Sequence, residues 1–195
     1  MTERATVLPM SILIPPMAND QITLSYDGRS FLGWQRHGDK PTVQFALEQA
    51  VTKAFDIRVP VQGSGRTDRG THAHGQVASL QLPAGTPPEL VKEKLNQLLT
   101  TEVRIIDVRC APTDFHACDS AIAKHYRYLI WNDRKLPAER DGRVWHVKEP
   151  LDVQAMHDTC SVFIGEKDFA SFATKTNFNQ KSTHRTVTQA TLTHE

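Results

Sequence analysis

The chain has 195 residues, enough for one large domain or two small ones. Hydrophobic residues make up 39% of it, and no apolar run approaches the roughly 18 residues that a membrane-spanning helix needs. We therefore expect a soluble globular protein with no membrane partner. Lysine and arginine number 23 against 22 acidic residues, so the net charge is +1 and any nucleic-acid binding must come from local basic clusters.

The amino-terminal stretch, residues 1–19, contains several prolines and has no helical period, which predicts a flexible arm. Its short apolar pieces lack a small-residue cleavage site, so a signal peptide is not expected. The first predicted element is a strand at 21–26, where polar and apolar residues alternate.

A helix is predicted after Thr42, a good N-cap residue, because apolar residues then recur at intervals of three and four up to residue 55. Residues 57–61 and 76–82 are predicted to be the second and third strands. On the third strand, alternation places three apolar side chains on one face: Ala78, Leu80 and Leu82.

Thr86 and Glu89 have the spacing of a capping box, which predicts a second helix that continues to Leu99. A fourth strand is predicted at 103–108. The first domain, residues 20–111, thus has the order βαββαβ of a ferredoxin-like unit. The expected fold class is α/β (α+β), with a mainly antiparallel sheet and helices on one face.

After residue 112 the pattern begins again, with strands predicted at 123–131 and 185–193. Between them Asp152 is predicted to cap a helix whose inward face carries apolar residues as far as Phe163 and which Gly165 stops. A second ferredoxin-like unit would need three more elements. We therefore expect residues 112–195 to form an incomplete second domain and the chain to be truncated; the alternative is an independently complete domain.

Three cysteines, Cys110, Cys118 and Cys160, form an odd set with irregular spacing. This pattern is typical of reduced thiols in a cytoplasmic protein. Although His116 lies between the first two, no second paired cluster completes the four ligands of a structural zinc, so no metal site is expected.

The residues from Gly65 to Ala73 combine backbone freedom with charge. Gly65 and Gly70 allow a ligand to approach the main chain closely. Between them Asp68 is flanked by Arg66 and Arg69, which favour its ionised form. Asp68 is therefore a candidate nucleophile. The alternative is a structural turn aspartate held by neighbouring amides.

This loop resembles the active-site motif of the tRNA pseudouridine synthase A family. Other motifs agree with that family in order and spacing from about residue 21 to the end of the chain. They are Tyr26-Asp27-Gly28, Phe31-Leu32-Gly33-Trp34-Gln35-Arg36, Gly75-Gln76-Val77-Ala78, Phe115-His116-Ala117, Tyr126-Arg127-Tyr128 and Asp168-Phe169-Ala170-Ser171-Phe172.

The resemblance implies a cytoplasmic homodimer that isomerises uridine to pseudouridine in the anticodon stem-loop of tRNA, without a metal or organic cofactor. Asp68 matches the family's catalytic aspartate, acting either as nucleophile or as base. Arg66 matches the residue expected to help displace the target base, and Tyr126 the tyrosine that packs on uracil. Further residues are expected to bind RNA: Phe115, His116, Ala117, Cys118, Asp119, Lys124, Arg127, Lys181 and Arg185.

Two departures bear on this hypothesis. Cys118 stands where the family usually has arginine, which removes a charge-assisted contact to RNA. The family's carboxy-terminal portion supplies a basic partner for the aspartate and an apolar wall beside uracil, so residues 1–195 alone are expected to be inactive. The alternatives are a non-catalytic RNA-binding module and a hydrolase that uses Asp68 and His72 as acid and base.

Overall fold

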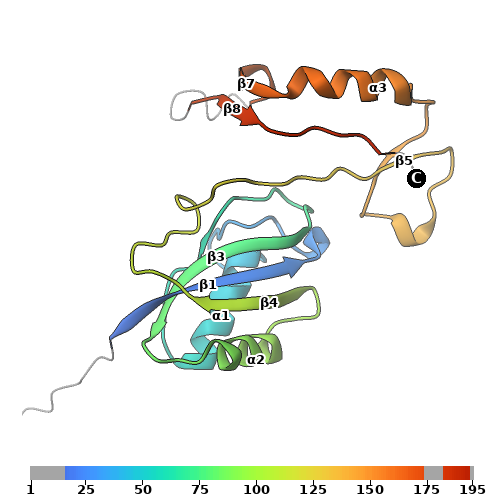
Figure 1. Cartoon of the computed structure of the whole chain (residues 1–195). Helices are drawn as coiled ribbons and strands as arrows, with labels where there is room; N and C mark the ends of the chain where they lie inside the picture. Colours follow the sequence, from blue (N-terminus) through green and yellow to red (C-terminus); the bar gives the residue numbers. More distant parts are fainter. Residues whose placement is uncertain (1–15, 174–181, 194–195) are drawn as a thin grey trace, which may run out of the picture. The chain divides into compact units, whose positions relative to one another are not determined.

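The computed structural model describes residues 16–173 and 182–193. The chain divides into two compact units, one ending at Tyr126 and the other beginning at Arg127 (Figure 1). The domain boundary expected from the sequence follows residue 111. The difference arises because the residues after 111 are bonded to the first unit; for example, the Ala117 amide donates to Ser79 Oγ at 3.1 Å.

The first unit is a four-stranded antiparallel sheet with helices α1 and α2 on one face (Figure 1). Its strands lie in the order β2-β3-β1-β4. With the helices between them this is the ferredoxin-like topology, so the predicted fold class is confirmed. The elements are β1 (Met17–Tyr26), α1 (Val43–Phe55), β2 (Gln62–Gly63), β3 (Ala73–Pro83), α2 (Pro88–Leu98) and β4 (Val103–Cys110).

The core lies between this sheet and its two helices. Alternate residues of β1, beginning at Ile22, are buried, as the period of two in a strand requires. The predicted face of β3 is confirmed, because Ala78, Leu80 and Leu82 are all buried. Both helices contribute an apolar stripe, represented by Leu47 of α1 and Leu95 of α2.

The helix starts follow the predictions in part. Thr42 caps α1 as expected, since its hydroxyl oxygen accepts from the Phe45 amide at 3.3 Å. The predicted capping box of α2 is wrong. Pro87 is the N-cap residue, and the Thr86 hydroxyl instead donates to the Pro83 carbonyl at 2.6 Å.

The strand predicted at 57–61 is also wrong, since β2 contains only Gln62–Gly63. The reason lies at buried Val61, whose backbone groups are bonded to side chains of α1. Glu48 Oε1 accepts from the Val61 amide at 3.2 Å, and Gln44 Nε2 donates to the Val61 carbonyl at 2.9 Å. Glu48 also accepts from Arg36 Nη1 at 2.8 Å, so one carboxylate of α1 holds two separate segments.

Glu48→Ala is expected to lower the free energy of unfolding by about 2–3 kcal/mol, because it leaves the buried Val61 amide without its acceptor and removes the ion pair between Glu48 and Arg36. Urea denaturation measures this change. The control is Glu93→Ala on the exposed side of α2, which should change stability by less than about 0.5 kcal/mol. Equal losses in the two variants would contradict a special role for Glu48.

The turn after β1 is capped by Asp27. Its carboxylate accepts from the Arg29 amide at 3.1 Å, which begins the short helix η1 (Gly28–Ser30), and it forms a two-pronged ion pair with the Arg29 guanidinium, at 2.9 and 2.7 Å. Hydrogen bonding from the Arg29 side chain is the main reason why the pKa of Asp27 falls to about 2, from an ordinary 3.8.

This lowered pKa gives a pH-dependent prediction. A depressed carboxylate pKa stabilises the fold above the unfolded-state value and loses that contribution as the pH falls through the folded-state value. Asp27→Asn should therefore melt below the wild type near pH 7, with a difference that shrinks between about pH 4 and about pH 2. Thermal unfolding at these pH values tests this. Asp114→Asn, at an exposed position, is measured alongside as the control. A constant Asp27→Asn difference would contradict the assignment.

The described residues of the second unit form two small two-stranded sheets, one α-helix and three short 3-10 helices (Figure 1). Asp152 caps α3 as predicted, because its carboxylate accepts from the Ala155 amide at 2.9 Å. The elements are β5 (Ile130–Asn132), η2 (Ala138–Arg140), β6 (Trp145–Val147), α3 (Val153–Cys160), η3 (Ser161–Phe163), β7 (Gly165–Asp168), η4 (Ala170–Phe172) and β8 (His184–Val187). Strands β5 and β6 are parallel, and β7 and β8 are antiparallel.

Two strand predictions in this unit are too long. The strand predicted at 123–131 begins only at Ile130, and the one predicted at 185–193 ends at Val187. Residues 121–128 are exposed, and no strand in the described part of the chain pairs with them, while the Leu129 carbonyl accepts from the Trp145 amide of β6 at 2.7 Å. A side-chain alternation cannot make a strand without a neighbour to accept its backbone hydrogen bonds.

At the amino terminus, β1 begins at Met17, which pairs with Pro83, so residues 17–19 belong to the sheet and not to a flexible arm. Residues 1–15 lie outside the described residues. No helix in the described ranges is long and apolar enough to cross a membrane.

Candidate functional site

The glycine-bounded loop at 64–72 joins β2 to β3 and carries the predicted catalytic residue. Asp68, Arg66 and Arg69 are all exposed. In residues 16–173 and 182–193, the Asp68 carboxylate makes no hydrogen bond or ion pair; only its backbone carbonyl is engaged, by the Thr71 amide at 3.1 Å. The alternative of a turn aspartate held through its side chain by neighbouring amides is therefore not what the structure has.

The start of this loop is fixed to β3. The Ser64 amide donates to the Val77 carbonyl at 2.8 Å, and the Gln76 side chain donates to the Gly65 carbonyl at 2.6 Å. These bonds extend the pairing with β3 into the loop and hold the backbone of Ser64 and Gly65 against β3, just before Arg66.

The middle of the loop is held by the segment that follows β1. The Trp34 amide donates to the Thr67 carbonyl at 3.0 Å, and the Tyr26 hydroxyl is 2.8 Å from the Thr67 hydroxyl. Burial raises the pKa of Tyr26, which keeps this hydroxyl protonated. Gly33 has φ +100°, and a Cβ there would lie 2.7 Å from the Thr67 carbonyl oxygen, so the contact requires glycine.

The end of the loop rests on Gly28. A Cβ at this position would lie 2.1 Å from the Thr71 carbonyl oxygen, closer than any side chain could be. Beside it, His72 Nδ1 is 3.4 Å from the Gly28 amide and 3.3 Å from Asp27 Oδ1. Sequence reasoning missed the contribution of these residues, and the signal that could have revealed it was the pair of glycines within the first motif.

The Phe-His-Ala motif lies against the sheet beyond the end of β4. Asn19 Nδ2 donates to three carbonyls of this segment, including that of Phe115 at 3.2 Å, and Ala117 is buried. Half-buried His116 has its Nδ1 3.0 Å from Asp119 Oδ2. Cys118 and Asp119 are exposed. Of the predicted RNA-binding residues here, Ala117 is thus covered by protein.

The Lys124 side chain lies beside Gly65, at the start of the Asp68 loop. Its Nζ lies 3.2 Å from where a Cβ on Gly65 would be, so its side chain runs along the loop backbone. Two residues further on, Tyr126 is exposed, with 68% of its surface accessible. It does not lie on a strand, contrary to the prediction.

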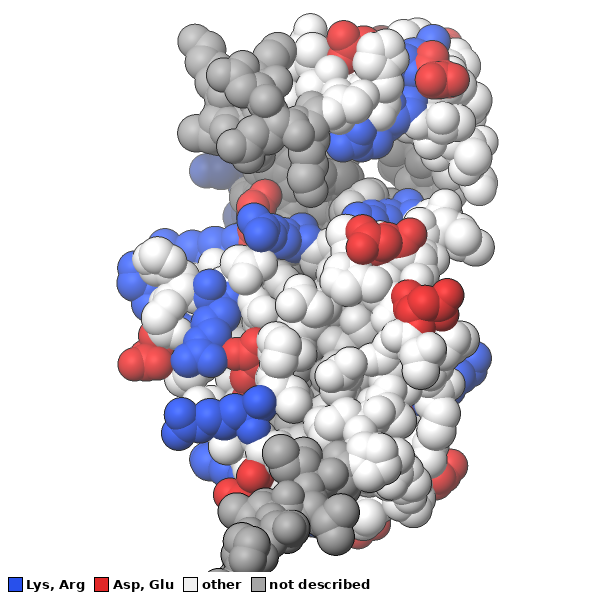
Figure 2. Space-filling model, turned by 90° about the vertical axis from the view of Figure 1, so that its left-hand side faces the viewer, with Lys and Arg blue, Asp and Glu red and all other residues white. Residues whose placement is uncertain are grey.

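The remaining predicted residues belong to the second unit. Arg127 is exposed, and Arg185 lies on β8, where its guanidinium donates to the Ser182 and His184 carbonyls at 2.7 and 2.6 Å. Lys181 lies outside the described residues. On the face drawn in Figure 2, basic side chains gather along one edge of the first unit with carboxylates among them. The basic side chains thus gather locally on this face, although the net charge of the whole chain is only +1.

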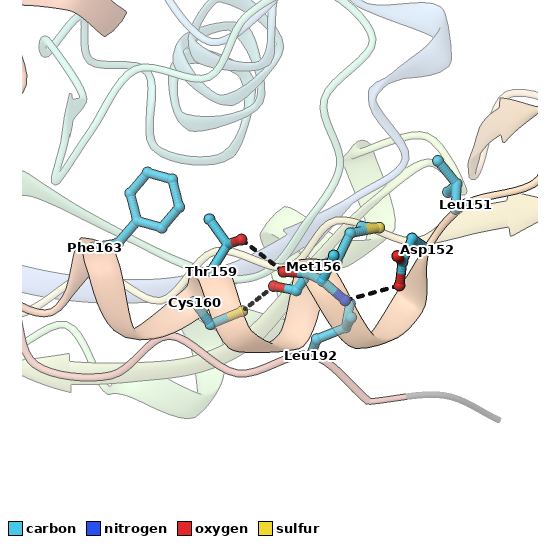
Figure 3. A pocket seen from close by; sticks show the side chains of 8 residues that line it. Leu151, Asp152, Met156, Thr159, Cys160, Phe163 and Leu192 are labelled. Atoms are coloured by element: carbon cyan, nitrogen blue, oxygen red, sulfur yellow. Dashed lines mark hydrogen bonds between the residues drawn. The ribbon is translucent and has the colours of Figure 1, made fainter.

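A separate cavity of about 470 Å³ lies along α3 in the second unit (Figure 3). Its lining is mainly apolar and comes from α3 and the residues around it, together with Leu192. None of the predicted site residues lines it. In the described part of the chain, no group of three His, Cys, Asp or Glu side chains is placed to hold a metal ion.

Comparison with known proteins identifies the family. The family model described as tRNA pseudouridine synthase matches residues 22–118. The tRNA pseudouridine synthase A of Methylacidiphilum infernorum (isolate V4) is 44% identical over 167 residues, covering 86% of this chain and 66% of that protein. That of Bartonella tribocorum is 40% identical over 159 residues, covering 80% and 64%.

A third relative, the tRNA pseudouridine synthase A of Geobacter sp. (strain M21), is 38% identical over 180 residues, covering 92% of this chain and 72% of that protein. The chain thus spans about two thirds of the length of the curated relatives it matches. Motif order, ferredoxin-like topology and these identities agree, and the chain belongs to the tRNA pseudouridine synthase A family.

Proposed function

We propose that this protein isomerises uridine to pseudouridine in the anticodon stem-loop of tRNA, with Asp68 as the catalytic residue. The observation that carries the proposal is the state of Asp68. Its carboxylate is exposed and unengaged by the described residues. The backbone beside it is fixed, because the Thr67 carbonyl accepts from the Trp34 amide and the Asp68 carbonyl accepts from the Thr71 amide. Such a group is presented to a ligand at little cost in ordering.

The reaction is an isomerisation within one nucleotide. The bond between uracil N1 and ribose C1′ breaks, the base turns, and a bond forms between uracil C5 and C1′. The C5 proton leaves and N1 gains a proton, so no atom is lost and no oxidant is required. The Asp68 carboxylate acts on the sugar in one of two ways. It adds to C1′ as the bond to N1 breaks and leaves when C5 attacks C1′, or it removes the C2′ proton and returns it once C5 has bonded to C1′.

Access to the sugar requires that the target base leaves its stack. Extrusion costs a few kcal/mol, and the planar guanidinium of Arg66, two residues before Asp68, is suited to occupy the vacated space while contacting phosphate. Tyr126 is proposed to stack on the displaced uracil, which its exposure permits.

Phosphate contacts are proposed for Lys124, Arg127, Lys181 and Arg185, since such contacts fix the register on RNA without reading its sequence. Half-buried Phe115 and His116 and exposed Asp119 complete the proposed surface. Cys118 contributes no charge-assisted bond there. By the same family resemblance we propose a cytoplasmic homodimer.

Asp68→Asn should reduce pseudouridine formation by about 10³-fold or more, since it removes the only carboxylate of the loop. The measurement is tritium release from tRNA labelled at uridine C5, with carbodiimide mapping of the modified positions, on the product of the complete reading frame. Asp39→Asn is the matched control, because the Asp39 side chain is 90% exposed and its ion pair with Arg36 spans 3.8 Å. This control should keep full activity.

Other outcomes would favour other functions. Tight tRNA binding without tritium release from the wild type would favour a non-catalytic RNA-binding module. Free uracil among the products would favour the hydrolase in which Asp68 and His72 act as acid and base. Equal pseudouridine formation by the wild type and Asp68→Asn would remove Asp68 from its proposed role.

Tyr126→Ala should lower kcat/KM about 5- to 150-fold, which corresponds to the ~1–3 kcal/mol of one base stacked on an aromatic ring. Tyr126→Phe keeps the ring and should retain most of the activity. Tyr128→Ala is the control, since Tyr128 is also exposed and lies two residues away. If Tyr128→Ala were as damaging as Tyr126→Ala, stacking would not be specific to Tyr126.

A further inference from the structure

The carboxy-terminal arm of the Asp68 loop is attached to the protein through a polar contact that the proposed chemistry does not use. His72 is the last loop residue before β3, and it lies against the turn that follows β1. There its Nδ1 is 3.3 Å from Asp27 Oδ1 and 3.4 Å from the Gly28 amide nitrogen.

This ring nitrogen faces one acceptor and one donor. When Nδ1 carries a proton, it donates to the Asp27 carboxylate. When Nδ1 is bare, it accepts from the Gly28 amide. The bond to Asp27 thus requires a proton on Nδ1, whereas the bond from the Gly28 amide requires its lone pair. Each of these two bonds holds the imidazole of His72, whose side chain is only 26% exposed, against the turn.

Asp27 is itself held in place from two directions. The Arg29 guanidinium binds its carboxylate through two nitrogens, and the Asp27 amide donates to the Glu102 carbonyl at 2.8 Å, just before β4. Among the charged groups near Asp27, Arg29 lowers its pKa, and the charge of Asp27 in turn acts to raise the pKa of Glu102, against the hydrogen bonds that lower it. The carboxylate that faces His72 thus has a fixed orientation.

The attachment extends directly to Asp68. The Thr71 amide, adjacent to His72, donates to the Asp68 carbonyl at 3.1 Å, and the Thr71 carbonyl packs against the Cα of Gly28. Rotation of the loop about its carboxy-terminal arm would break both contacts.

We propose that Asp27 and His72 form a positioning pair that fixes the carboxy-terminal arm of the loop and so sets where Asp68 meets the nucleotide sugar. This inference rests on the proposed function for its effect on catalysis. Neither residue is catalytic, since both act through the loop backbone.

The test compares Asp27→Ala, His72→Leu and the double variant in the product of the complete reading frame, by tritium release from uridine-labelled tRNA. A displacement of the loop of about 1 Å should lower kcat about 10- to 100-fold in each single variant, with KM changed less than about threefold. Because the residues act as one pair, the double variant should be no slower than the worse single variant.

Conservative and control variants separate positioning from folding. His72→Asn keeps a polar atom near the Nδ1 position and should recover most of the kcat that His72→Leu loses. Asp27→Asn should likewise recover most of the kcat that Asp27→Ala loses. These two conservative variants replace the single variants if either of those fails to fold. His37→Leu alters an exposed histidine outside the site and should leave kcat unchanged. Hydrogen exchange of the Thr71 amide should be faster in Asp27→Ala and His72→Leu than in the wild type.

Unchanged kcat and unchanged Thr71 exchange in both single variants would overturn the positioning pair, as would multiplicative losses in the double variant. Failure of the proposed function is recognised separately, because the wild type itself would then release no tritium. In that case the exchange of Thr71 alone decides whether the pair anchors the loop.

Discussion

The close backbone contact between the segment after β1 and the loop between β2 and β3 is the constraint on which the candidate site depends. Gly28 touches the Thr71 carbonyl and Gly33 the Thr67 carbonyl, at distances that leave no room for a Cβ. Gly63 similarly lies under the Trp34 indole. These contacts bring one backbone directly against the other on both sides of Asp68, where a side chain would hold them apart.

Helix α1 also holds the two segments that meet at the Asp68 loop. Gln44 and Glu48 lie four residues apart, on one face of the helix, and bind the backbone of Val61 just before β2. Glu48 also binds Arg36, just after the segment that contacts the loop. The segment after β1 and the segment before β2 are thus both bonded to one helix, and a preorganised site requires such support from a rigid element.

The second unit is built differently. Helix α3 contains no buried residue, and its apolar side chains line an open cavity. The helix begins at a local bond, in which the Asp152 carboxylate accepts from the Ala155 amide. The catalytic proposal accordingly depends chiefly on the first unit, where the Asp68 loop and its supports are fully described, while the roles of Arg127 and Arg185 depend on contacts with RNA.

The sequence by itself determined the features set by short-range rules: the start of α1 at Thr42, the buried face of β3, the glycine-bounded Asp68 loop and the order of motifs that indicates the family. Only the tertiary structure decided where backbone hydrogen bonds go. Val61 is satisfied by helix side chains and so forms no strand, whereas residues 123–128 pair with no strand in the described chain. Local pattern specifies what a segment prefers, but a strand exists only where another segment is present to pair with it.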